Sequence, residues 1–161
     1  MISPLQFRRY VIRPAIRRLG LDSEAAEWLL LGTALVESDL TWLVQKGGGP
    51  ALGLYQIEPR TERDLWRNYL DHRAALAARV RSLMTGQART QQLVTNLAYA
   101  TAIARLIYRR VPEPLPAADD LPGLARYWKA HFNTAAGTGT PRTFMRRMEP
   151  FRNGPIERRD L

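Results

Sequence analysis

Glu37 is the residue whose surroundings point most clearly to chemistry. It lies near the end of the most apolar helix that the sequence predicts, and its neighbours one turn earlier, Thr33 and Ala34, leave that face without another charge. A carboxyl group placed there loses solvation, which raises its pKa and lets it keep a proton near neutral pH. Such a group can act as a general acid. The alternative is a carboxylate at a helix end that reaches water or an arginine.

Two short sequences on either side of a glycine-rich stretch carry a family resemblance. They are Ala34-Leu35-Val36-Glu37-Ser38 and Gly53-Leu54-Tyr55-Gln56-Ile57. In this order they resemble the lysozyme-like family of lytic transglycosylases and goose-type lysozymes, whose signature is a Glu-Ser pair at a helix end followed by a Gly-Leu-(aromatic or Met)-Gln-(Ile/Leu/Val) strand. Asn96 and the pair Phe132-Asn133 before Gly137 extend the resemblance, which covers about residues 22–148 and is strongest to forms encoded by tailed bacteriophages.

The resemblance implies cleavage of bacterial peptidoglycan at the β-1,4 bond between N-acetylmuramic acid and N-acetylglucosamine. Glu37 would protonate the leaving oxygen and then remove the proton of the sugar's own 6-hydroxyl, which forms a 1,6-anhydro end without water or a second carboxylate. We therefore expect a lytic transglycosylase, with no cofactor. The substrate-binding residues that the resemblance implies are Ser38, Tyr55, Gln56, Asn96, Phe132 and Asn133.

Some of these residues also have plain structural interpretations. The Ser38 hydroxyl could bond to its own helix backbone, and Tyr55 could pack in the core. The family has a tyrosine near the catalytic acid where this chain has Phe132, so the hydroxyl would have to come from Tyr99 or Tyr127. The spacing from Asn133 to the next glycine is also longer than in the family.

Glu58 is the candidate for a second carboxylate. It follows the Gly-Leu-Tyr-Gln-Ile stretch directly, where goose-type lysozymes carry an Asp proposed to activate water. If Glu58 faces the cleft, the alternative activity is that of an inverting muramidase, with carboxyl groups about 6.5–9.5 Å apart. Otherwise Glu58 is an exposed partner of Arg60 or Arg63. Asp39 is a weaker candidate, because two residues along a helix point it away from Glu37.

The charge balance indicates an anionic partner. The 161-residue chain has a formal net charge of +9, and only Lys46 and Lys129 among its 24 basic residues are lysines. Nucleic acid, a membrane surface or an acidic polymer such as the cell wall would all fit. The rival to an enzyme is a nucleic-acid-binding helical protein, suggested by Arg9, Arg13 and Arg17 at helical spacing. A third interpretation is an inactive, glycan-binding virion protein.

Two kinds of chemistry are disfavoured by the residues present. The chain has no cysteine, which excludes disulfides, a thiol nucleophile and thiolate metal sites. His72 and His131 have no partner at ligand spacing, so we expect no metal site. With the resemblance in view, peptidoglycan is the expected partner, along with phage virion proteins, and nucleic acid is not.

The elements that must position these residues are mostly helical. Periodicity and caps predict helices at about 22–42, 61–70, 74–85, 90–111, 121–132 and 141–149, with Asp22 or Ser23 capping the first of these and Thr90 the fourth. Residues 43–60 form a glycine-rich loop that leads into a short extended segment or hairpin over 54–57. Four prolines make 112–122 a stiff connection, and Pro14 should break or kink a helix over 4–19.

We therefore expect a single lysozyme-like domain over 1–161, mainly α, of the α+β type with a small β or irregular element around 44–60. Its core spans about 22–148, preceded by a helical segment over 1–21 and followed by a polar tail over 150–161. No apolar run is long enough for a transmembrane segment, and the N-terminal residues do not form a signal peptide. A protein that acts on the wall would then be carried in a virion or otherwise delivered to the periplasm.

Overall fold

The protein is mainly helical in the computed structural model, which describes residues 1–135 and 137–152. Its longest helices are α3 (Glu24–Ser38), α7 (Leu97–Arg109) and α9 (Pro141–Arg152). The shorter helices are α1 (Pro4–Phe7), α2 (Arg13–Leu19), α4 (Pro59–Asn68), α5 (Ala74–Arg81), α6 (Arg89–Thr95) and α8 (Leu121–Trp128). Within the described ranges, no helix is both long and apolar enough to cross a membrane.

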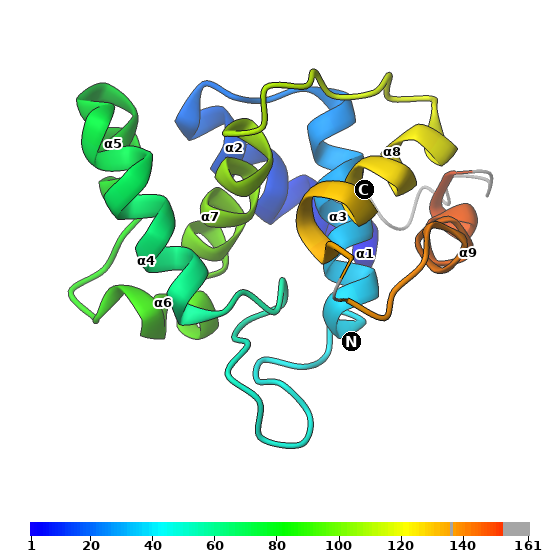
Figure 1. The fold of residues 1–161 in the computed structure, drawn as a ribbon, viewed down its shortest axis with the longest axis horizontal. Coiled ribbons are helices and arrows are strands. Elements are labelled where there is room, and N and C mark those ends of the chain that lie inside the picture. The colour runs from blue at the N-terminus through cyan, green and yellow to red at the C-terminus, as the bar shows by residue number, and fades with distance from the viewer. Residues whose placement is uncertain (136, 153–161) are drawn as a thin grey trace.

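Helix α3 runs through the middle of the fold and is buried along most of its length (Figure 1). As predicted, Ser23 caps it, since its side-chain oxygen accepts a hydrogen bond from the backbone N–H of Ala26 at 3.1 Å. Helix α9 approaches α3 closely at Gly32, where a Cβ atom would lie 2.2 Å from the Phe144 ring. The middle of α3 is therefore held by close packing against α9.

The N-terminal segment stays helical through Pro14. Helix α1, a π-helical turn over Arg8–Ile12 and α2 follow one another without a gap. Proline donates no backbone hydrogen bond and its ring crowds the preceding turn. The wider π-helical turn, closed by the N–H of Arg13 on the carbonyl of Arg8, accommodates the proline. The break expected at Pro14 is thus replaced by a local widening of the helix.

The single helix predicted over 90–111 is wrong, because the chain breaks at Asn96 into α6 and α7. Asn96 has an extended backbone, and its side-chain oxygen accepts a hydrogen bond from the N–H of Tyr99 at 3.0 Å, so it caps α7. Thr90 lies inside α6, whose capping residue is Ala88. The other predicted helices are present as α3, α4, α5, α8 and α9, with ends that differ by a few residues.

Residues 39–58 form the irregular end of the molecule, drawn cyan to blue-green beyond the last turn of α3 (Figure 1). Of the extended segment or hairpin predicted here, the part of the chain that the structure describes has only a tight turn between one antiparallel pair, Leu52 and Ile57. Gly53–Gln56 form a turn closed by a 3.0 Å backbone hydrogen bond, and Leu52 and Ile57 exchange backbone hydrogen bonds at 3.0 and 2.9 Å. With a bridge between Val44 and Leu52, these isolated pairs are the β-structure of the described residues, so an α+β fold is not confirmed.

The turn over 53–56 depends on its glycine. Gly53 has a φ of +72°, and a Cβ atom there would lie 1.9 Å from the carbonyl oxygen of Leu93 in α6. A side chain at this position would therefore meet both backbone strain and a clash. The alternating apolar and polar residues that follow Gly53 lie in this turn. Within the described residues no neighbouring strand extends the single pair of Leu52 and Ile57.

The C-terminal part of the chain packs against α3 through helices α8 and α9. Residues 112–120 connect α7 to α8 without a helix, as their prolines predict. The helix predicted over 121–132 is α8 followed by a π-helical turn, Lys129–Asn133. Helix α9 continues to Arg152, so the first residues of the predicted tail are helical. The rest of that tail, 153–161, lies outside the described residues.

Candidate active site

An open cleft of about 930 Å³ lies where the last turn of α3 meets the loop 39–58, the start of α4, the end of α7 and the turn 129–133. Its volume is that of a site for a small-molecule or oligomeric ligand. Six of the eight predicted site residues line it, although they come from separate stretches of the chain: Glu37, Ser38, Gln56, Glu58, Phe132 and Asn133.

Glu37 lies in the last turn of α3 with its carboxyl group largely withdrawn from solvent. Burial raises its pKa from the usual 4.5 to about 7, although hydrogen bonds from Trp128 and Asn133 and the charge of Lys129 act in the opposite direction. The indole Nε1 of Trp128 donates to Glu37 Oε1 at 3.2 Å. The protonated and ionised forms are therefore both accessible near neutral pH, as general acid and base catalysis requires.

Lys129 fixes the orientation of the Asn133 side chain beside Glu37. Its ammonium group donates to Asn133 Oδ1 and to the carbonyl of Gly137, both at 2.8 Å. Because the amide oxygen is occupied by Lys129, the amide NH₂ group is left to interact with the Glu37 carboxyl. Lys129 and Asn133 are the first and last residues of the π-helical turn, which the N–H of Thr134 closes on the Lys129 carbonyl at 2.8 Å.

Ser38 has the structural role that the sequence suggested as an alternative to substrate binding, because its hydroxyl bonds to backbone carbonyls. Its buried hydroxyl is within hydrogen-bonding distance of the carbonyls of Ala34, at 3.1 Å, and Leu54, at 2.7 Å. It therefore ties the end of α3 to the turn over 53–56. Gln56 has a φ of +48° and donates from Nε2 to the Gly53 carbonyl at 2.8 Å, so its side chain also holds this turn while lining the cleft.

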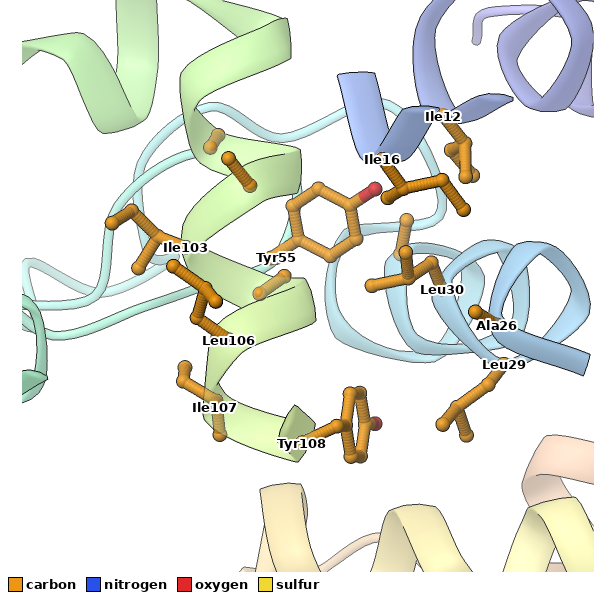
Figure 2. Close-up of a cluster of buried hydrophobic side chains, with 14 of the residues drawn as sticks. Ile12, Ile16, Ala26, Leu29, Leu30, Tyr55, Ile103, Leu106, Ile107 and Tyr108 are labelled. Atoms are coloured by element: carbon orange, nitrogen blue, oxygen red, sulfur yellow. The ribbon is translucent and has the colours of Figure 1, made fainter. Parts of the chain in front are cut away.

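Two predicted binding residues are not in the cleft. Tyr55 is 1 % exposed, its hydroxyl lies 3.1 Å from Thr101 Oγ1, and Figure 2 shows its ring inside the core with Leu30 and Ile103. Asn96 caps α7, and its amide donates to the carbonyl of Leu83 at 2.8 Å. Both were predicted from the resemblance, and both residues instead stabilise the scaffold around the cleft.

Neither tyrosine considered as a replacement for the family's hydroxyl reaches Glu37. Tyr99 donates to Glu62 Oε1 at 2.6 Å, deep between α4 and α7. Tyr127 donates to the backbone carbonyl of Glu113 at 2.9 Å. Glu37 receives a hydrogen bond from an indole N–H, and neither of these two tyrosines supplies the missing hydroxyl.

Phe132 lines the cleft and packs on a third tyrosine, Tyr108, with ring centroids 5.4 Å apart. The Thr33 hydroxyl donates to the carbonyl of Leu29 at 2.7 Å and lies 2.7 Å from the Tyr108 hydroxyl. Tyr108 must then donate to Thr33, since Thr33 has already given its proton. The phenol of the tyrosine that packs on Phe132 is thus directed into the core.

The other two carboxylates of the cleft are each paired with an arginine. Glu58 forms an ion pair with Arg60, as the structural alternative predicted. Asp39 accepts from Arg147 of α9 at 2.8 Å. Both groups line the cleft, and Glu37 differs from them because the cleft's arginines do not pair with it.

No protein-family model, curated protein or solved structure matches this chain. Function is therefore inferred from the chemistry of the cleft.

Three residues of the site were not predicted as functional. Trp128 and Lys129 surround Glu37 from a segment some ninety residues away, and Trp42 lines the cleft beside the glycine-rich loop. A tryptophan and a lysine close to Asn133 were visible in the sequence, but only the fold brings them to Glu37. Trp42 was predicted only as the last residue of the helix over 22–42, and its exposure is a property of the fold.

Two of the three arginines at helical spacing in the N-terminal segment have acidic partners. Arg13 pairs with the buried Glu27 of α3 at 2.8 Å, as does neighbouring Arg8 at 2.9 Å. Arg17 lies 3.8 Å from Asp22. This weakens the case for a continuous nucleic-acid surface there. Within the described residues no cluster of three or more histidine or acidic side chains is arranged to hold a metal ion.

Proposed function

We propose that this protein is a peptidoglycan-cleaving enzyme of the lytic transglycosylase type, with Glu37 as its acid and base. The observation that carries the proposal is a carboxyl group with a pKa of about 7 at the wall of an open cleft. Perturbed carboxyl groups in clefts are typical of catalytic sites. The order of motifs in the sequence adds the substrate class, the bond between N-acetylmuramic acid and N-acetylglucosamine.

In the first step, protonated Glu37 gives its proton to the glycosidic oxygen, the bond from that oxygen to C1 breaks, and the electron pair leaves with the oxygen. The resulting oxocarbenium-like sugar is electron-poor at C1. The Glu37 carboxylate then takes the proton of the 6-hydroxyl while O6 bonds to C1, which closes the anhydro ring and restores the acid. Trp128, Asn133 and Lys129 stabilise the carboxylate between the two steps, because all three favour its charged form.

The pairing of the other carboxylates supports this reaction over hydrolysis. Asp39 and Glu58 are held by Arg147 and Arg60, so neither is poised as a free base. The transglycosylase reaction needs only Glu37. Since Glu58 does line the cleft, an inverting muramidase with Glu58 as base is the second candidate. Delivery in a phage particle is also part of the proposal and follows from the sequence resemblance alone.

The test is digestion of purified peptidoglycan followed by mass spectrometry of the soluble products. We expect anhydro-ended products, one water lighter than hydrolysis products, from the native protein and none from folded Glu37→Gln. Reducing ends that disappear in Glu58→Gln would establish the hydrolase instead. No soluble product from the native protein, together with steeply salt-dependent DNA binding, would favour the nucleic-acid-binding alternative.

A further inference from the structure

Trp42 stands apart from the other tryptophans of the chain. It is 44 % exposed, whereas Trp28, Trp66 and Trp128 are buried. It lines the cleft, and the ammonium group of Lys46 lies 4.0 Å from the centroid of its ring. A lysine over an indole face is a favourable cation–π contact. Trp42 is followed by two more exposed apolar residues, Leu43 and Val44, and contiguous exposed apolar surface is typical of binding sites.

The backbone holds Trp42 and Lys46 in place. The N–H of Trp42 donates to the Ser38 carbonyl at 3.2 Å, and its own carbonyl accepts from Gln56 Nε2 at 3.5 Å. Gln45, directly before Lys46, donates from its backbone N–H to the Ala51 carbonyl at 3.1 Å. Its side-chain oxygen accepts from the Ala51 N–H, also at 3.1 Å. Hydrogen-bonded turns at the end of α3 thus hold the backbone of Trp42 and Lys46. This limits the conformational entropy that is lost when a ligand binds.

Lys46 also differs from the arginines of the cleft lining. Within the described residues each of those arginines has a carboxylate partner, and Lys46 has none: the pairs are Arg60 with Glu58, Arg110 with Asp64 and Arg147 with Asp39. A lysine with no ion pair, held next to an accessible indole, offers one positive charge to a ligand that already touches the ring.

We propose that Trp42 and Lys46 form a subsite for an acidic amino sugar, namely an N-acetylmuramic acid unit that carries a peptide. A face of the sugar ring lies against the part of the indole that Lys46 leaves uncovered, and a carboxylate of the attached peptide binds the Lys46 ammonium group. The C–H groups of a sugar face complement the electron-rich face of an aromatic ring. This inference rests on the proposed function. It adds that the cleft recognises glycan strands bearing peptides in preference to bare strands.

The experiment measures binding of soluble glycan strands to the folded Glu37→Gln protein by calorimetry. One sample of strands keeps its peptides, and the other has lost them to an amidase. We expect Trp42→Ala to weaken binding of both samples about tenfold, equivalent to ~1.4 kcal/mol, and Trp42→Phe to retain most of it. Lys46→Gln should reduce binding of the peptide-bearing strands to the level of the bare strands, and Lys46→Arg should restore the difference.

Arg63→Gln, which removes an exposed charge outside the cleft lining, is the matched control and should leave both affinities unchanged. Unchanged affinity in Trp42→Ala, or an equal effect of Lys46→Gln on both samples, overturns the subsite. Digestion of intact peptidoglycan by the native protein separates this result from the proposed function. If digestion fails while binding still depends on Trp42, the catalytic proposal is wrong and the subsite stands. If digestion is normal and binding does not depend on Trp42, the subsite is wrong and the catalytic proposal stands.

Discussion

Replacing Glu37 with glutamine should make the protein more stable at alkaline pH. In the unfolded chain this carboxyl ionises near its usual 4.5, whereas in the folded protein burial raises its pKa to about 7. Between these values the folded state holds a proton that the unfolded state has released. The free energy of unfolding must then fall as the pH rises through this window, because the native state binds more protons.

The size of the effect follows from the two pKa values. Their separation is about 2.5 pH units, and at ~1.4 kcal/mol per unit the cost of ionising Glu37 in the folded protein reaches about 3 kcal/mol. Partial exposure to the cleft makes this an upper limit. Below pH 4.5 both states are protonated and the cost is absent, and above pH 7 it is present in full. Glutamine has nearly the same shape and no charge, so the free energy of unfolding of the variant does not include the cost of ionising this side chain.

The assay is urea unfolding of the native protein and Glu37→Gln at several pH values from about 4 to about 9. We expect similar stability near the acid end of this range and an advantage for the variant that grows to between about 1 and 3 kcal/mol by about pH 8. Glu58→Gln, which changes a carboxylate paired with an arginine, is the control and should show no such gain. A stability difference between native protein and Glu37→Gln that stays constant with pH would refute the raised pKa and remove the main support for catalysis.

Two further substitutions test the supports of Glu37 and of the neighbouring turn. Lys129→Met should raise the pKa of Glu37 above about 7, by less than one pH unit, because it removes a charge that favours the carboxylate; carboxyl ¹³C resonances measure this, and an unchanged or lower pKa would contradict it. Ser38→Ala should lower the free energy of unfolding by ~1–3 kcal/mol, since the buried Leu54 carbonyl loses its partner. Thr41→Val, at an exposed hydroxyl, should cost under ~0.5 kcal/mol in the same denaturant titration.

Local patterns were sufficient to predict α3 and the environment of Glu37. The cap at Ser23 and the apolar run that follows depend on residues within one or two turns of the helix. Tertiary contacts do not alter such local interactions. The raised pKa followed from the same pattern, since a carboxyl on an apolar helix loses water wherever that helix is packed. The mainly helical architecture was predictable for the same reason.

Features that depend on distant partners were not predictable in this way. The stretch over 54–57 alternates like a strand, but a strand needs a neighbour, and the fold gives it only the bridge between Leu52 and Ile57. Asn96 interrupts a pattern that is apolar on both sides, and besides capping α7 its side chain donates to the carbonyl of Leu83 in a different part of the chain. The hydrogen bond from Trp128 to Glu37 spans 91 residues, so nothing near Glu37 in the sequence indicates it.

The net charge and the raised pKa of Glu37 look contradictory, since surrounding positive charge should favour the carboxylate. The ion pairs resolve this. The arginines of the cleft lining are each paired with an acidic side chain: Arg147 with Asp39, Arg60 with Glu58 and Arg110 with Asp64. Lys129 is the charge that acts on Glu37, and burial outweighs it. A strongly basic chain can thus keep one carboxyl partly protonated near neutral pH, because the arginines around the cleft are paired with acidic side chains and burial outweighs the charge of Lys129.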